Sequence, residues 1–120
     1  MSDYTSVVDY DNSHLNKYVR NGYEPVSVKD FKRISIDTIS YLPEHRRYGA
    51  MYPNMNIFIK ALFDDNDQMY FSTTLNIDTA HVANFDCGSV TEAIDKINEI
   101  LLTASNRCKV YDSAFSEIGL

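Results

Sequence analysis

The stretch MNIFIKALFDDNDQMYFSTTLNI, residues 55–77, decides the fold of this chain because it holds two apolar-rich runs joined by a polar turn. The runs are MNIFIKALF (55–63) and QMYFSTTLNI (68–77), and the residues between them are DDND (64–67). Aspartate and asparagine favour tight turns because their short side chains bond nearby backbone amides. The stretch therefore predicts two antiparallel strands joined as a hairpin.

A helix is predicted downstream of this hairpin, beginning after Ser89. Ser89 and Glu92 have the spacing of a capping box, in which side chains accept hydrogen bonds from free backbone amides of the first turn. Apolar residues then recur at helical spacing, namely Val90, Ala93, Ile94, Ile97, Leu101 and Ala104. The solvated face that we expect on the other side comprises Asp95, Lys96, Asn98 and Glu99.

Upstream of residue 25, one short helix is predicted. Ser13 stands where an N-cap would, and Asn21-Gly22 supplies a left-handed stop, which together indicate a helix at about 13–21. The polar, acidic residues 1–12 fit either a flexible arm or an edge strand, and the sequence does not separate the two.

Residues 26–42, VSVKDFKRISIDTISYL, are rich in β-branched side chains and partly alternate between apolar and polar positions. They fit one long strand or two short ones. The apolar positions of this alternation are Val26, Val28, Ile34 and Ile36.

The end of the chain completes the predicted fold. After Asn106 the alternating piece CKVYDSAF, residues 108–115, fits a returning edge strand. The fold class that follows is α+β, with a single domain over residues 1–120. We expect an antiparallel sheet of about four to five strands, with one long C-terminal-half helix and one short N-terminal helix packed on it.

The composition is that of an ordinary globular domain with an uneven charge distribution. Apolar residues make up 44% of the 120 residues and charged residues 23%, and the net charge is −6. Residues 14–62 carry eight bases against four acids, whereas residues 63–120 carry three bases against ten acids. A basic middle therefore precedes an acidic C-terminal half. The net charge of the whole chain nevertheless argues against a protein dedicated to binding polyanions.

No apolar run approaches the roughly 18–20 residues that span a bilayer, and the residues MSDYTSVVDY (1–10) show neither the basic n-region nor the apolar h-region of a signal peptide. We therefore expect no membrane partner and a cytoplasmic location. The two cysteines, Cys87 and Cys108, are too few for a disulfide scaffold, so free thiols are expected.

A loop between two prolines is the most distinctive candidate site. Residues 43–53 gather charged and aromatic side chains, of which the predicted partner contacts are His45, Arg46, Arg47, Tyr48 and Tyr52. Loops often carry binding residues, and arginine and tyrosine dominate the energy of many interfaces. The alternative is that the rings pack back onto the sheet and the arginines are merely solvated.

Lys32 and Arg33 extend this candidate surface. With Lys17, Lys29 and Lys60 they interleave with the rings of Tyr18, Tyr23, Phe31 and Tyr41. Proteins that grip single-stranded nucleic acid use such a combination, with cations on phosphates and rings stacked on bases. The alternative is that the rings belong to the core and the bases form a solvated face.

Motifs for catalysis, metals or cofactors are not recognisable in the sequence. His81, Cys87 and Cys108 lack paired ligand spacing, and DDND lacks the glycine and distal glutamate of a calcium loop. No phosphate-binding glycine motif or nucleophile elbow is present. We therefore expect no catalytic residues, no metal and no cofactor.

The function predicted from these features is a small non-catalytic inhibitor or adaptor that docks on a protein or nucleoprotein partner. Such chains are common among products of phages and mobile elements. The first alternative is a single-stranded nucleic-acid-binding protein that uses the same basic and aromatic residues. Two further possibilities stay open: an acidic C-terminal half that imitates nucleic acid, and a homodimer formed through the final strand. A small enzyme is the least favoured class.

Overall fold

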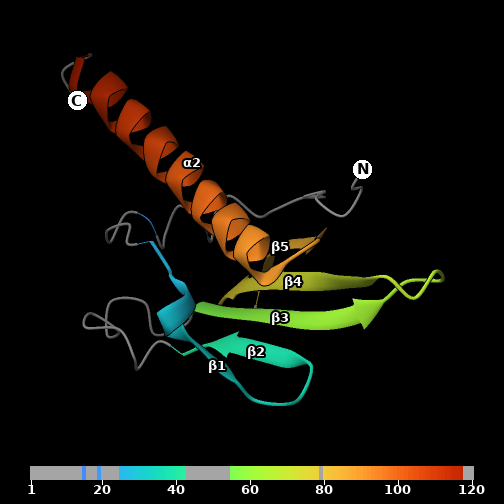
Figure 1. Ribbon diagram of the computed structural model, residues 1–120. Helices are drawn as coiled ribbons and strands as arrows, with labels where there is room; N and C mark the ends of the chain where they lie inside the picture. The colour runs from blue at the N-terminus through green and yellow to red at the C-terminus, as the bar shows by residue number, and fades with distance from the viewer. Residues whose placement is uncertain (1–14, 16–18, 20–24, 43–54, 79, 118–120) are drawn as a thin grey trace.

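The computed structural model describes residues 15, 19, 25–42, 55–78 and 80–117, with 107–117 described by their backbone (Figure 1). These residues form one five-stranded antiparallel sheet and one long helix that crosses a single face of it. In chain order the elements are the 3-10 turn η1 (Val28–Asp30), β1 (Phe31–Arg33), β2 (Thr38–Tyr41), β3 (Met55–Phe63), β4 (Met69–Ile77), β5 (Ala80–Cys87) and α2 (Val90–Glu117). The predicted α+β class and antiparallel sheet are confirmed.

The hairpin predicted at residues 55–77 is confirmed as β3 and β4, paired from Met55↔Ile77 to Phe63↔Met69. Its turn is held by one carboxylate. Asp64 Oδ1 accepts hydrogen bonds from the backbone N–H groups of Asn66, at 2.8 Å, and Gln68, at 2.9 Å. The turn is thus closed by the local aspartate chemistry that the sequence indicated.

Replacing Asp64 by Ala is expected to lower the free energy of unfolding by about 1 kcal/mol, because two turn amides lose their acceptor. Urea denaturation followed by circular dichroism measures the change. The matched control is Asp65→Ala in the same turn, where a change below about 0.5 kcal/mol is expected. Equal losses in both variants would mean that turn charge, and not the Asp64 hydrogen bonds, sets the effect.

Residues 26–42 contain two short strands, β1 and β2. The sequence analysis had allowed either one long strand or two short ones. A tight turn separates them, in which the N–H groups of Ile34 and Ser35 donate to Thr38 O. This turn breaks the expected alternation. Val28, Ile34 and Ile36 are 63%, 57% and 89% exposed, so of the four apolar positions of that alternation only Val26 is buried. The inward side chains are instead those in the register of β1 with β2, where Phe31 lies opposite Tyr41.

Two further elements differ from the sequence predictions. Strand β5, which pairs with β4, was not predicted, because a register shift opposite Leu75 and Asn76 interrupts its alternation. The edge strand expected at 108–115 is wrong, since α2 continues as one helix to Glu117. The apolar residues of that piece are compatible with either period, and the helix that begins at Val90 extends through them.

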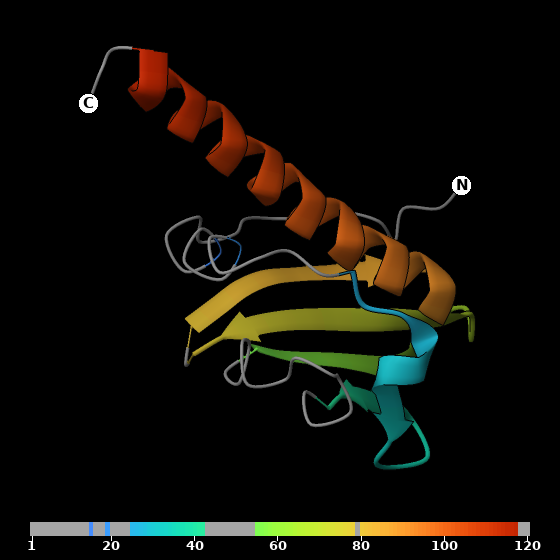
Figure 2. The same cartoon turned by 90° about the vertical axis from the view of Figure 1, so that its left-hand side faces the viewer.

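The core lies between α2 and the inner face of the sheet (Figure 2). Its strand residues alternate along β3, β4 and β5, and its helix residues are those predicted from the apolar spacing, Ile94, Ile97, Leu101 and Ala104 among them. The predicted helix at about 13–21 lies almost entirely outside the described residues. Its two described members, Leu15 and Val19, are both buried in this core. Residues 1–12 also lie outside the described part of the chain.

One residue assigned to the solvated face of the helix is instead a structural contact. Asn98 is partly buried, and its Oδ1 accepts a hydrogen bond from Val26 N–H at 2.8 Å while its Nδ2 donates to Val26 O at 2.8 Å. The prediction that Asn98 faces only solvent is therefore wrong. The side-chain amide ties the segment before η1 to α2 and holds the Val26 side chain in the core, where it is 2% exposed.

Candidate binding surface

The face of the sheet opposite α2 presents a second set of side chains, which we call the open sheet face. Because neighbours along a strand point to opposite faces and paired residues share one, the register assigns its members. Its members are Lys32, Thr38, Ser40, Asn56, Phe58, Lys60, Leu62, Tyr70, Ser72, Thr74, Asn76, His81, Asn84 and Asp86. Among the described elements, helix α2 packs only on the other face.

Hydroxyl and amide side chains predominate on the open sheet face, and a few rings and cations interrupt them. Phe58 is 37% exposed near its middle. The register sets Lys32 opposite Ser40 and Ser40 opposite Phe58, so a cation, a hydroxyl and a ring follow one row across three strands. Lys60 lies two residues from Phe58 along β3 and is exposed on the same face. Two ammonium groups thus flank one accessible aromatic ring.

The sequence analysis did not single out Phe58. Its neighbours Ile57 and Ile59 are both buried, so three consecutive apolar residues conceal the alternation. Counting by twos from Met55 gives a buried face of Met55, Ile57 and Ile59 and leaves Phe58 on the opposite face. The two-residue alternation of β3 could therefore have identified Phe58 as an accessible ring.

The described residues on either side of the proline-bounded loop lie next to this row. Its predicted contact residues His45, Arg46, Arg47, Tyr48 and Tyr52 all lie outside the described residues. The described ends are Leu42, after β2, and Met55, at the start of β3, and these two strands pair directly. Leu42 N–H also donates to Asp30 O at 3.1 Å, which fixes the first end against η1.

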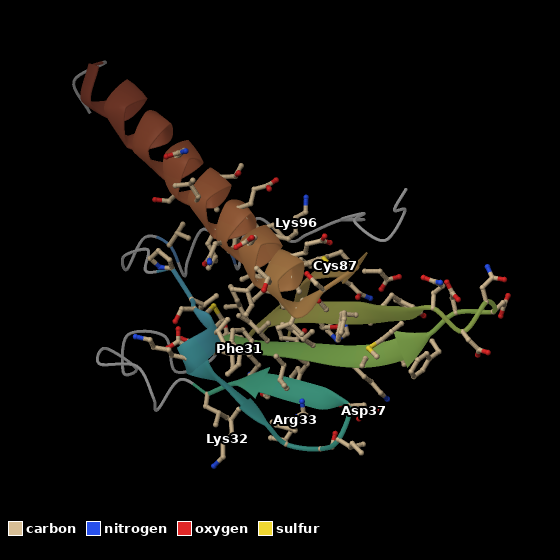
Figure 3. The ribbon with its side chains drawn as sticks, in the orientation of Figure 1. Phe31, Lys32, Arg33, Asp37, Cys87 and Lys96 are labelled. Atoms are coloured by element: carbon tan, nitrogen blue, oxygen red, sulfur yellow. The ribbon has the colours of Figure 1, made fainter. Side chains whose placement is uncertain are left out.

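The structure separates the other two predicted contact residues, Lys32 and Arg33. As neighbours on β1 they lie on opposite faces, and only Lys32 belongs to the open sheet face (Figure 3). Arg33 is exposed on the other side, where its Nη1 donates to Ile36 O at 3.2 Å across the turn between β1 and β2. Lys32 therefore lies in the row with Phe58, whereas Arg33 also supports a local turn.

Two rings of the predicted aromatic surface belong to the core. Tyr41 is 1% exposed, and Phe31 packs against it edge to face, with ring centroids 5.9 Å apart and an interplanar angle of 64°. These rings stabilise the β1–β2 edge of the sheet. Tyr18 and Tyr23 lie outside the described residues.

The basic middle and the acidic C-terminal half of the sequence lie in different parts of the fold. Strands that follow one another in the chain also neighbour one another in the sheet, so the order β1 to β5 preserves the sequence order. Four of the five bases with described side chains, Lys29, Lys32, Arg33 and Lys60, lie on η1, β1 and β3, and the fifth, Lys96, lies on α2. The acids Asp30, on η1, and Asp37, in the turn between β1 and β2, lie beside the first four. The β3–β4 turn, β5 and α2 carry most of the described carboxylates.

Asp37 at the basic edge is held ionised by its surroundings. Hydrogen bonds from the hydroxyls of Ser35, at 2.9 Å, and Thr38, at 3.1 Å, lower its pKa, and the charge of Lys60 adds to this effect. The carboxylate is therefore occupied in shaping the turn between β1 and β2.

Cys87 and His81, the described cysteine and histidine, lie on opposite faces of β5. Burial, and to a smaller extent the charge of Glu92, raises the pKa of the Cys87 thiol to about 11, so at neutral pH the sulfur is protonated. His81 is exposed on the open sheet face, whereas Cys87 is fully buried on the inner side of β5. Within the described residues, no group of three or more histidine, cysteine or acidic side chains is placed to hold a metal ion.

Comparison with models of known protein families gives no match, and comparison with curated proteins and with solved structures gives none either. In the described part of the chain, no helix is both long and apolar enough to cross a bilayer.

Proposed function

We propose that this protein is a non-catalytic binding protein, an inhibitor or adaptor that docks on a protein partner through the open sheet face and the adjoining 43–53 loop. The observation that carries the proposal is the 37% exposed ring of Phe58, with Lys60 beside it on β3 and Lys32 across the buried Ser40 on β1. A sheet covered by a helix on one face leaves the other available, and the strands hold its side chains at fixed spacing.

The chemistry of this face supports a protein partner. An accessible ring between cations offers apolar area and charge together, a combination typical of residues that dominate interfaces. Hydroxyl and amide groups around the ring supply donors and acceptors for a polar rim. Because the flanking charges are positive, the complementary surface of the partner is acidic.

The test compares a double charge reversal on the open sheet face with a single charge reversal elsewhere, in capture of the partner from a lysate of the source organism. Lys32→Glu with Lys60→Glu is expected to reduce capture at least about tenfold, because both flanking charges are reversed. Lys96→Glu is the control: this partly buried lysine of α2 pairs with Glu99 at 3.6 Å and lies away from the open sheet face (Figure 3). Equal capture by both variants would show that the open sheet face does not contact the partner.

The loop is tested separately from the strands. Replacing Arg46, Arg47 and Tyr48 together by Ala is expected to abolish capture while leaving the melting temperature nearly unchanged. If capture persists in this variant and is lost in the lysine variant, the strands alone form the contact. Loss in both variants means that loop and sheet act as one surface.

A second candidate is binding of single-stranded nucleic acid. It is favoured by the same ring between two lysines, since bases stack on exposed rings and ammonium groups neutralise phosphates. Fluorescence anisotropy with labelled single-stranded and duplex oligonucleotides over a salt series distinguishes the two. Micromolar binding that weakens steeply with salt and is lost on Phe58→Ser would replace the protein-docking proposal, and no binding at low salt would eliminate this candidate.

A further inference from the structure

The turn between β1 and β2, residues 34–37, carries two strongly exposed aliphatic side chains. Ile34 is 57% exposed and Ile36 is 89% exposed, so neither contributes to the core. Single exposed apolar residues are common on protein surfaces, whereas neighbouring ones indicate contact with another molecule or with a membrane. The turn is therefore a candidate contact separate from the open sheet face, to which neither isoleucine belongs.

The backbone of this turn is fixed by hydrogen bonds, so the fold itself holds the two isoleucines outward. The N–H groups of Ile34 and Ser35 donate to Thr38 O at 3.0 and 3.3 Å. Ser35 Oγ donates to Asp37 Oδ1 at 2.9 Å. Ala61 N–H donates to Asp37 O at 2.7 Å, which ties the turn to β3. The turn thus forms a firm apex beyond the paired residues of β1 and β2.

Cations surround the base of the turn on both faces of the sheet. Lys32 and Lys60 are exposed on the open sheet face. Arg33 is exposed on the other face, and its Nη1 donates to Ile36 O at 3.2 Å, so the guanidinium lies against the turn (Figure 3). The acid within the turn is Asp37. Three positive charges and one negative charge therefore accompany the apolar apex.

Most of the described acids lie away from this turn. Helix α2, with Glu92, Asp95 and Glu99, extends past the sheet on the opposite side of the molecule in both Figure 1 and Figure 2. The β3–β4 turn, with Asp65 and Asp67, lies apart from the β1–β2 turn in both views. Exposed charges separated by more than about 8 Å are largely screened at physiological ionic strength. A surface that touches the β1–β2 turn therefore meets its cations, although the net charge of the chain is −6.

We propose that the β1–β2 turn binds the surface of an anionic lipid bilayer. Ile34 and Ile36 insert at the level of the headgroups, and the cations at the base of the turn contact the lipid phosphates. Lysine and arginine suit this position because their stems lie along apolar surface while their charged ends stay with the phosphates. A bilayer surface accommodates a protruding aliphatic apex, whereas the residues that dominate protein interfaces are centrally placed and packed into pockets.

Binding at a bilayer surface is different from spanning the bilayer. From the sequence we expected no membrane partner, because no apolar run has spanning length, and the proposal replaces that expectation: surface binding needs only a few apolar side chains and cations. Each cation near an anionic surface strengthens binding about fivefold. The contact is weak, with half of the protein bound at a lipid concentration on the order of 1 mM. It does not depend on what the open sheet face binds.

Vesicle flotation of the full-length protein tests the proposal. Vesicles of phosphatidylcholine with about 30% phosphatidylserine are expected to bind the protein at least about tenfold more strongly than pure phosphatidylcholine vesicles. Raising the salt concentration from about 50 mM to about 500 mM is expected to weaken this binding by about tenfold, because it screens the cations of the turn.

A pair of double variants tests the apolar apex. Ile34→Ser with Ile36→Ser is expected to weaken binding to the anionic vesicles at least about tenfold, because the inserted apolar area is lost. The matched control is Phe63→Ser with Met69→Ser. These two residues pair across the end of the β3–β4 hairpin and are 63% and 49% exposed, but the turn beside them is acidic. The control is expected to change binding by less than about twofold. Circular dichroism shows whether both double variants keep the fold.

Tryptophan fluorescence tests insertion directly. The chain contains no tryptophan, so an introduced one reports on its own position. Ile36→Trp is expected to give a blue-shifted emission with anionic vesicles and to be quenched by brominated lipid. Leu102→Trp is the control on α2, where Leu102 is 48% exposed, and it is expected to give neither response.

Three results would overturn the proposal. One is no binding to anionic vesicles at low salt up to about 10 mM lipid, well above the expected midpoint. If capture of a protein partner is then lost in the Ile34 and Ile36 double variant, the turn is a protein contact instead. Another is equal weakening by the two serine double variants, which places the contact elsewhere. The third is vesicle binding without a blue shift of Ile36→Trp, which excludes insertion of the apex.

Discussion

Replacing Asn98 by Ala is expected to lower the free energy of unfolding by about 2 kcal/mol, the largest loss predicted for a single polar side chain of this protein. Asn98 makes two hydrogen bonds of 2.8 Å to the backbone of Val26, one accepted and one donated. Without them a partly buried N–H and C=O lose their partners. Helix propensity alone predicts the opposite result, because alanine favours a helix over asparagine by about 0.6 kcal/mol. A loss of stability would therefore indicate the Val26 contact.

Asn106→Ala is the matched control, because Asn106 is an exposed asparagine on the same helix. It is expected to be neutral or slightly stabilising, within about 0.5 kcal/mol. Chemical denaturation of both variants measures the difference. If Asn98→Ala proved as mild as the control, the Val26 contact would contribute nothing net, and the segment before η1 would be held by apolar burial alone.

Replacing Thr73 by Val is expected to raise the free energy of unfolding by about 1–2 kcal/mol. Thr73 is 0% exposed on the inner face of β4, between Ile59 on β3 and Phe85 on β5. Its Oγ1 has no hydrogen-bond partner among the described residues. Valine has nearly the same shape and β-branching, so the change removes a buried hydroxyl without opening a cavity.

Thr74→Val is the control for this gain. Thr74 is the next residue of β4, and its side chain is half-buried on the open sheet face. The β-propensity change is the same at both positions, whereas the burial differs, so Thr74→Val is expected to stay within about 0.5 kcal/mol. A loss of stability in Thr73→Val would show that the hydroxyl has a partner in the folded protein.

The parts of the fold that the sequence predicted are those specified by local chemistry. Asp64 closes a turn with its own neighbours, and Ser89 and Glu92 cap the helix with bonds of 3.1 Å from Glu92 N–H to Ser89 Oγ and 3.0 Å from Gly88 N–H to Glu92 Oε2. Such contacts span only a few residues, so the sequence order alone reveals them. The hairpin and the start of α2 were therefore predictable.

The errors occurred where an apolar pattern fitted two structures or where a contact came from a distant segment. CKVYDSAF has apolar residues compatible with a strand or a helix, and the continuation of α2 selected the helix. Asn98 looks like a solvent-facing residue until Val26, 72 positions away in sequence, meets it. Residues 34 and 36 alternate like a strand, yet a tight turn places both isoleucines in solvent.

The candidate surface was predictable only in part. Sequence reasoning found the basic middle of the chain and included Lys32, but it grouped Lys32 with Arg33, and a strand places adjacent residues on opposite faces. It left open whether Phe31 and Tyr41 were surface rings or core rings, and both pack at the edge of the core. The ring that the open sheet face displays, Phe58, was concealed between two buried isoleucines.

By itself, then, the sequence of this protein determined the α+β class, the β3–β4 hairpin, the N-terminal end of α2 and the separation of basic from acidic segments. Each depends on residues close together in the chain, on capping, turn chemistry, periodicity and charge. Only the tertiary structure decided which side chains share a face, that Asn98 binds Val26, and that α2 continues past the sheet. Those outcomes depend on the register between strands and on packing between distant segments, which local patterns do not specify.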